Sequence, residues 1–148
     1  MILNLRDLEV EDVDGRFGMQ SLTRACGASL TGTSVYELAA GAKHWPYHFE
    51  VIDEEWLFVI VGEVVLRTAD GEQVLRAGDV ACFPAATAHG VRNDSDAVAR
   101  FAMLSARPRL GGDAVVYPDS GKFVIRAAGG FSHRGFLGEQ VDYWEGEA

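Results

Sequence analysis

Four side chains in this sequence have the types and spacing of a metal site. His48 and Glu50 are two residues apart, so in an extended strand both side chains leave the same face. Glu55 follows soon after, and His89 stands among small residues in a second polar cluster, residues 78–93. Imidazole nitrogen and carboxylate oxygen together suit a divalent cation such as Fe, Mn, Ni or Zn, and the set has no thiolate to select copper.

The same groups also allow chemistry without a metal. Two carboxylates that share a cavity repel each other, so one of them tends to stay protonated. A carboxylic acid beside His48 and His89 can transfer protons to and from a substrate. The residue types alone leave both kinds of chemistry open.

Short strands must position these groups, because no stretch has the pattern of a long amphipathic helix. The apolar run Trp56–Val61 predicts a buried strand that begins at Glu55, with Trp56, Phe58 and Phe83 in the core. Asp70-Gly71 predicts a hairpin turn. The other predicted strands span residues 22–26, 33–38, 63–69, 72–76, 80–83, 88–93, 97–105, 115–117 and 122–126.

Strands this short and regularly spaced predict an all-β antiparallel sandwich or barrel, which can enclose a ligand cavity. A chain of 148 residues is one domain of ordinary size. We expect the barrel core at about residues 20–105, preceded by an edge strand or arm within residues 1–16. The extension 106–148 is rich in glycine and aromatic residues, so it is expected to pack on the barrel or on a second subunit, which favours a homodimer.

Composition limits the partners. The net charge of −9 repels phosphate backbones and anionic lipid, so the chain is predicted to bind neither nucleic acid nor membranes, and small molecules are the expected ligands. No apolar run approaches the roughly 20 residues of a spanning helix, and the N-terminus lacks the pattern of a signal peptide. A cytoplasmic protein is expected, with Cys26 and Cys82 as buried, reduced thiols.

Two segments resemble the two sequence motifs of the cupin superfamily. The first motif is usually glycine, five residues, His-x-His, three or four residues, glutamate, six residues and glycine. This chain has Gly41, six residues, His48-Phe49-Glu50, four residues, Glu55, six residues and Gly62. It therefore departs from the family pattern by one extra residue before His48 and by Glu50 in place of the second histidine.

The second motif matches more closely. The family pattern is glycine, five residues, Pro-x-Gly, two residues, histidine, three residues and asparagine. Here the residues are Gly78, Pro84-Ala85-Ala86, His89 and Asn93, at the same spacing. The one departure is Ala86, which stands where the family has glycine.

The resemblance implies a single-domain jelly-roll barrel, the double-stranded β-helix, of the kind found in small bacterial cupins of unassigned activity. In the family, the two histidines and the glutamate of the first motif and the histidine of the second hold one divalent metal ion in the barrel mouth. Carried over to this chain, the metal ligands are His48, Glu50, Glu55 and His89. The resemblance also implies that dimers are common. Because the fold hosts many unrelated chemistries, it assigns no catalytic residue.

Three functions stay open at this point. The first is a metal-dependent enzyme, of oxygenase or isomerase type, acting on a small organic molecule. The second is a non-catalytic module that binds or senses a small molecule. The third is a metal-independent isomerase or epimerase of carbohydrate derivatives, which needs basic residues in the cavity to hold a phosphate. Its candidates are Lys43, Arg67 and Arg92.

Three other residues, Glu54, His44 and His133, compete with these candidates for the site. Glu54 adjoins Glu55, and the spacing to Gly62 favours Glu55. His44 and His133 fall outside the motif spacing; His44 is predicted to lie at the rim or surface, and His133 at the surface or an interface. Pro46 makes a helix that would pair His44 with His48 improbable.

Overall fold

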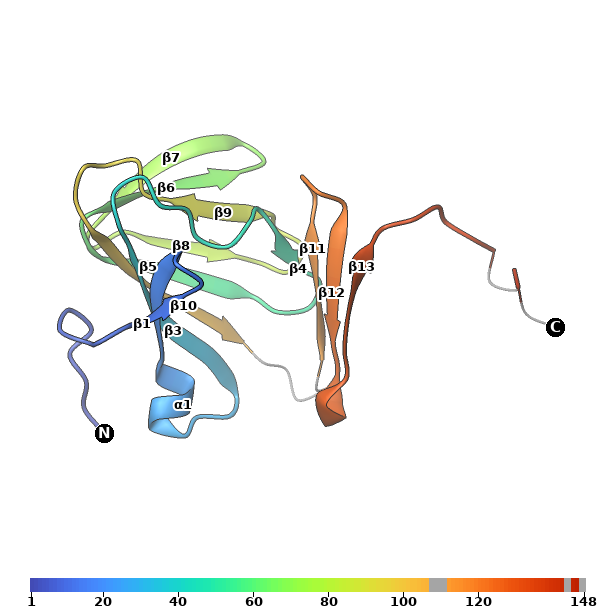
Figure 1. Cartoon of the computed structure of the whole chain (residues 1–148), viewed down its shortest axis with the longest axis horizontal. Coiled ribbons are helices and arrows are strands. Elements are labelled where there is room, and N and C mark those ends of the chain that lie inside the picture. Colours follow the sequence, from blue (N-terminus) through green and yellow to red (C-terminus); the bar gives the residue numbers. More distant parts are fainter. Residues whose placement is uncertain (107–111, 143–144, 147–148) are drawn as a thin grey trace.

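The chain is built almost wholly from antiparallel strands (Figure 1). A computed structural model describes residues 1–106, 112–142 and 145–146. The strands are β1 (Glu11–Val13), β2 (Phe17–Ser21), β3 (Thr31–Leu38), β4 (Phe49–Glu50), β5 (Glu55–Val61), β6 (Glu63–Thr68), β7 (Gly71–Arg76), β8 (Val80–Phe83), β9 (His89–Arg92), β10 (Ala99–Ala106), β11 (Asp113–Tyr117), β12 (Lys122–Arg126) and β13 (Ser132–Phe136). The helical segments are α1 (Leu22–Cys26) and η1 (Ala128–Gly130). The all-β prediction is confirmed.

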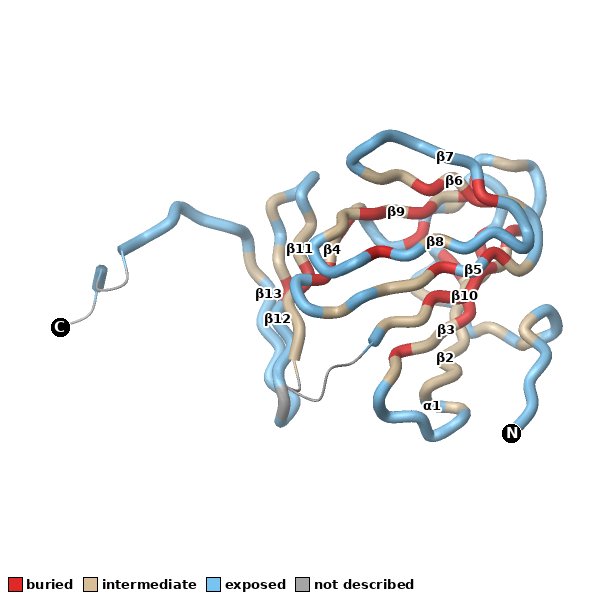
Figure 2. The backbone as a smooth tube through the Cα atoms, turned by 180° about the vertical axis from the view of Figure 1, so that it is seen from behind, coloured by how far each residue is buried: buried red, intermediate tan, exposed pale blue. Residues whose placement is uncertain are grey.

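Two sheets enclose the core. A six-stranded sheet has the order β1-β2-β3-β10-β5-β8, and a three-stranded sheet has the order β7-β6-β9. The core takes side chains from both, including Leu57 and Phe101 of the first sheet and Leu66 and Val91 of the second. Figure 2 shows the buried residues gathered on these barrel strands. This arrangement is the jelly-roll barrel that the sequence motifs imply.

Strand β5 shows how the barrel sorts its side chains. Leu57 and Val59 are buried, whereas Phe58 is 42% exposed. Trp56 is half-buried and stacks on Phe58 on the outer face. The prediction that Trp56, Phe58 and Phe83 all lie in the core is therefore right only for Phe83. Because successive side chains alternate between faces, Glu55 lies on the same side of β5 as the buried Leu57 and Val59.

The predicted strand at Leu22–Cys26 is wrong, because these residues form helix α1. The Ser21 hydroxyl accepts a hydrogen bond from the Arg24 N–H, which satisfies one of the free donors of the first turn. Gly27 ends the helix with a φ of 68°, a conformation that glycine adopts without a steric penalty. Both capping residues are visible in the sequence, but a five-residue helix leaves too short a pattern to outweigh the strand-like composition.

Both ends of the chain add strands. Strand β1 pairs with β2 and forms an edge of the six-stranded sheet, as expected for part of residues 1–16. Beyond the barrel, β11 pairs with β4, and β12 and β13 complete a four-stranded sheet of order β13-β12-β11-β4, which stands beside the barrel (Figure 1). The predicted strands 115–117 and 122–126 are present, but β13 was missed because its sequence, SHRGF, is largely polar.

Other expectations about packing differ from the structure. Cys26 and Cys82 are exposed, not buried, because one ends α1 and the other lies on the edge strand β8. In the extension, Phe131 and Phe136 are 59% and 74% exposed, while Tyr143 and Trp144 lie outside the described residues. The homodimer stays a prediction. None of the helices in the described ranges is long and apolar enough to cross a membrane.

Candidate metal centre

The four side chains singled out in the sequence meet at one point of the barrel. One ligand atom from each of His48, Glu50, Glu55 and His89 lies within 4.8 Å of the others. His48, Glu50 and His89 are buried, with exposed fractions of 7%, 9% and 1%, and Glu55 is half-buried. Residues 41 positions apart in the chain thus supply the two imidazoles of one compact cluster.

The main chain holds the two histidines side by side. The His48 N–H donates to the His89 carbonyl at 3.0 Å, and the His89 N–H donates to the His48 carbonyl at 2.8 Å. Residues paired in this way on antiparallel strands project their side chains from the same face. The ring centroids are accordingly 4.8 Å apart.

Each imidazole has the same hydrogen bond on its outer nitrogen. His48 Nδ1 lies 2.7 Å from the Pro46 carbonyl oxygen, and His89 Nδ1 lies 3.0 Å from that of Thr87. A carbonyl can only accept, so Nδ1 must carry the proton in both rings. When the imidazole is neutral, this leaves the Nε2 lone pair free to bind a metal, as is usual for metal-ligating histidines.

The Nε2 atoms point at the two carboxylates. His48 Nε2 lies 3.2 Å from Glu50 Oε1, and His89 Nε2 lies 3.2 Å from Glu55 Oε2. The His89 nitrogen is nevertheless buried without a hydrogen bond of acceptable geometry. A lone pair facing a carboxylate oxygen is repulsive unless a cation, either a proton or a metal ion, lies between them. The donor set therefore fits a divalent ion.

The electrostatic effects agree with this picture. Burial by itself would lower the pKa of His48, but the hydrogen bond and negative charge of Glu50 outweigh burial and raise it. Burial likewise opposes the ionisation of Glu50, yet contact with His48 brings its pKa below the usual value. Each partner therefore favours the charged form of the other, protonated His48 and ionised Glu50, as a carboxylate beside a cation does.

The structure distinguishes Glu54 from Glu55. Glu54 is exposed, and its Oε1 accepts a hydrogen bond from Trp56 Nε1 at 2.8 Å on the outer face. Glu55 lies on the inner face of β5 and reaches His89. The period-two alternation of a strand sends adjacent residues to opposite faces, which is why only Glu55 joins the cluster.

His44 lies in the interior, so its predicted place at the rim or surface is wrong. It is 7% exposed, and its ring packs against four aromatic side chains: Phe17, Tyr36, Trp45 and Phe101. Its Nε2 is buried without a hydrogen-bond partner. Burial, with smaller effects from His48 and His89, lowers the pKa of His44 well below 6.5. His133 is exposed, as expected.

Asn93, the last residue of the second motif, is structural. It is fully buried, and its side-chain amide donates to the carbonyls of Leu38, Ala39 and Ala97. Its Oδ1 accepts hydrogen bonds from the N–H and hydroxyl of Ser95. A buried amide satisfied on every side fixes the loop that follows β9.

A cavity of about 780 Å³ opens beside the cluster. His48, Glu50 and Glu55 line one side of it, and the apolar part of its wall comes from Tyr36, Trp45, Met103, Val115 and Phe123. Val115 and Phe123 belong to the C-terminal sheet, which also contributes the basic residues Lys122, Arg126 and Arg134. A pocket of this size that combines apolar side chains with several ionisable groups suits a small polar or charged molecule.

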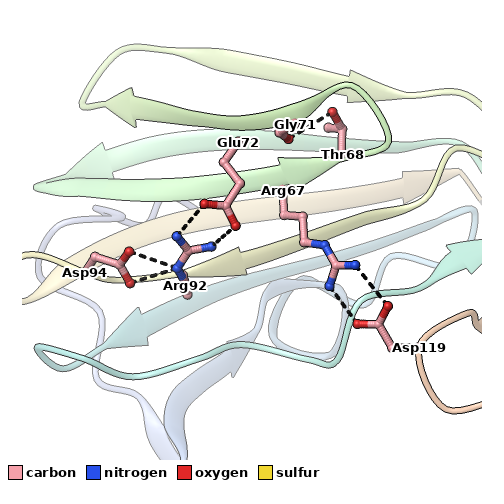
Figure 3. Close-up of polar contacts among 7 residues, drawn as sticks. All are labelled: Arg67, Thr68, Gly71, Glu72, Arg92, Asp94 and Asp119. Atoms are coloured by element: carbon pink, nitrogen blue, oxygen red, sulfur yellow. Dashed lines mark hydrogen bonds and ion pairs between the residues drawn. The ribbon is translucent and has the colours of Figure 1, made fainter.

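The three basic residues named as candidates for holding a phosphate do not lie in the cavity. Lys43, Arg67 and Arg92 are absent from its lining. Figure 3 shows Arg67 bonded to Asp119 and Arg92 held between Glu72 and Asp94. Sequence reasoning missed Lys122 and Arg126, although their spacing on the predicted strand 122–126 already placed them on one face. It had no signal for Arg134, because β13 was not predicted.

The known proteins that are similar to this chain have the same kind of fold. The model of a family described as "Cupin domain" matches residues 34–105. No curated protein matches the chain. Among solved structures, a sugar phosphate isomerase of the cupin superfamily from Silicibacter pomeroyi is 27% identical with a TM-score of 0.78, and the match covers 87% of this chain and 82% of that one.

Two further structures are similar at lower identity. A candidate sugar phosphate isomerase from Acidithiobacillus ferrooxidans is 24% identical with a TM-score of 0.75, over 85% of this chain and 81% of that one. The oxalate decarboxylase of Lactobacillus farciminis is 19% identical with a TM-score of 0.57, over 70% of this chain and 32% of that one. The family match identifies residues 34–105 as a cupin domain, and the jelly-roll topology agrees with the similarity to a solved structure of the cupin superfamily over most of the chain.

Proposed function

We propose that this cupin binds one divalent metal ion, Fe, Mn, Ni or Zn, through His48, Glu50, Glu55 and His89. We further propose that it is a metal-dependent enzyme acting on a small organic molecule held in the adjacent cavity. The observation that carries the proposal is the shared geometry of the two imidazoles. Both have Nδ1 bonded to a main-chain carbonyl and Nε2 directed at a carboxylate.

The donor set defines what such a site can do. A bound divalent ion would act as a Lewis acid that polarises a carbonyl or hydroxyl oxygen of the ligand. Two carboxylates formally neutralise its charge, so a bound water would be acidified less than at a site with one carboxylate. Aromatic rings hold the imidazoles in place: the buried Phe83 stacks on the His89 ring, and Tyr117, which lines the cavity, lies over the ring of His48.

A second candidate is a metal-independent isomerase of carbohydrate derivatives. It is favoured by the similarity to the Silicibacter pomeroyi sugar phosphate isomerase, which extends over most of both chains. In this case the raised pKa of His48 and the lowered pKa of Glu50 define a charged pair at the cavity wall. Such a pair can accept a proton from one carbon of a ligand and return it to the next.

Metal analysis separates the two candidates. Protein purified without an affinity tag should contain close to one equivalent of Fe, Mn, Ni or Zn, measured by inductively coupled plasma mass spectrometry. His48→Ala and His89→Ala should each abolish metal retention, because each removes one nitrogen ligand. His133→Ala, which truncates an exposed histidine, is the matched control and should keep the wild-type content.

A metal-free wild-type protein of intact fold would contradict the first proposal. In that case, isomerisation of aldose and ketose phosphates by the metal-free protein tests the second candidate. A metal content that is the same in His48→Ala, His89→Ala and wild type would place the ion elsewhere in the chain.

A further inference from the structure

One wall of the cavity is formed by the C-terminal sheet, which contains β4, β11, β12 and β13. In the register of β4, β11, β12 and β13, Glu50 lies opposite Val115, Val115 opposite Val124, and Val124 opposite Arg134. Residues directly opposite each other on antiparallel strands share a face. Glu50 of the metal cluster and Arg134 therefore belong to one row that crosses the sheet.

Alternation along the strands adds two more cations to this face. Lys122 and Arg126 lie two residues on either side of Val124, so they project from the same side as Val124 and Arg134. All three basic residues line the cavity. Ser132, opposite Arg126 in the register, adds a hydroxyl to the same wall.

Within the part of the chain that the structure describes, no ion pair is found for Lys122, Arg126 or Arg134. Arg67, Arg76, Arg92 and Arg100, by contrast, each pair with a carboxylate. Asp113 lies opposite Arg126, but its carboxylate accepts the Ile52 N–H at 2.9 Å. In a chain with a net charge of −9, three cations without acidic partners on one cavity wall are a local reversal of sign.

Tyr117 links the basic wall to the metal cluster. The Tyr117 ring, on β11, stacks on the ring of His48. Lys122, on the neighbouring strand β12, places its Nζ 5.3 Å from the centroid of the Tyr117 ring. Burial raises the pKa of Tyr117, while the charges of Arg126 and Arg134 act to lower it and that of Glu50 to raise it. The hydroxyl is thus within electrostatic reach of both ends of the cavity.

We propose that Lys122, Arg126 and Arg134 bind an oxyanion group, phosphate or carboxylate, of the small molecule that occupies the cavity. Guanidinium groups match the geometry of these anions and bind them through paired hydrogen bonds. Three strand spacings of about 4.8 Å place the β13 main chain roughly 14 Å from that of β4. This separation suits an organic molecule with its anionic group at the basic wall and an oxygen at the histidine cluster.

The inference rests on the proposed function for the metal-bound end of the ligand, but the anion subsite can be tested separately. The probes are inorganic phosphate and malonate, titrated into the purified full-length protein by isothermal calorimetry. Arg126→Gln/Arg134→Gln should weaken binding of the preferred probe by roughly tenfold or more, because it removes charge-assisted hydrogen bonds. Its metal content should equal that of wild type.

Two controls complete the experiment. Arg16→Gln neutralises an exposed arginine that does not line the cavity, so it should bind the probe as wild type does. His89→Ala removes a metal ligand and excludes binding of phosphate to the metal itself, so it should retain probe binding within about threefold. Loss of binding in His89→Ala with full binding in Arg126→Gln/Arg134→Gln would overturn the proposal and place the anion on the metal.

The remaining outcomes are also decisive. Tighter binding of phosphate supports a phosphorylated ligand, and tighter binding of malonate supports a carboxylated one. If wild type is metal-free but the double variant still loses probe binding, the subsite stands while the metal proposal fails. No binding of either probe to wild type, or equal binding to wild type and the double variant, would refute the subsite.

Discussion

The Ala86 N–H donates to the Glu50 carbonyl at 2.7 Å, which joins the loop of the second motif to the strand that carries the first. To make this bond Ala86 adopts a φ of 64°, the left-handed region that costs an L-residue other than glycine about 1–2 kcal/mol. The family has glycine at this position. The chain therefore holds a strained residue directly beside its candidate metal centre.

Ala86→Gly should raise the free energy of unfolding by about 0.5–1 kcal/mol. Relief of the left-handed strain outweighs the additional backbone entropy that glycine brings to the unfolded chain. Urea unfolding of the metal-free protein measures the change. Ala85→Gly is the matched control, because Ala85 has no positive φ, and it should lower stability by about 0.5–1 kcal/mol. Equal effects of the two substitutions would show that Ala86 is not strained.

Glu55→Gln should weaken metal binding by at least about 100-fold, because it removes a charged oxygen donor of the proposed metal centre on the inner face of β5. Glu54→Gln should leave metal affinity unchanged, since its side chain bonds to Trp56 on the outer face. Competition with a chromophoric chelator measures both affinities. A larger loss in Glu54→Gln would mean that the inner and outer faces of β5 have been assigned the wrong way round.

Glu50→His should increase metal retention, on the order of tenfold in affinity for Fe, Ni or Zn. The substitution replaces one of two mutually repelling carboxylates by a neutral nitrogen donor in a buried position next to His48. Glu54→His provides the control for an added histidine outside the cluster. Metal content after dialysis is the measurement, and an unchanged content in Glu50→His would place residue 50 outside the coordination sphere.

His44→Phe should make the free energy of unfolding depend less steeply on pH under acidic conditions. The folded protein keeps His44 neutral at pH values where the unfolded chain binds a proton, because burial lowers its pKa well below 6.5. The unfolded state then holds more protons, so the free energy of unfolding falls as the pH drops below about 6.5. One such group contributes at most about 1.4 kcal/mol per pH unit.

Urea unfolding between about pH 5 and pH 7 in the presence of a chelator measures this slope. Wild type should lose stability more steeply with falling pH than His44→Phe, whose ring is apolar and fits the same aromatic surroundings. His133→Phe, at an exposed position, should keep the wild-type slope. Identical slopes for wild type and His44→Phe would mean that His44 is protonated in the folded protein.

Local signals in the sequence were sufficient for the class of fold and for the composition of the candidate site. Short apolar runs with period two, turn residues such as Asp70-Gly71 and two motifs of fixed spacing do not depend on distant contacts. They predicted β3 and β5 to β12 but not β2 or β4, and they favoured Glu55 over Glu54. Short elements carry weaker local signals: the composition of α1 favours a strand, and the exposed residues of β13 have little apolar pattern.

Only the tertiary structure decided which side chains meet. Strand register is set by pairing between distant segments, so the exchange of hydrogen bonds between His48 and His89 has no local signature. The same is true of the burial of His44 among residues from four segments, and of the row that places Glu50 and Arg134 on one face. The types and spacing of the ligands are local properties of the chain, whereas the shape and charge of the cavity arise from long-range packing.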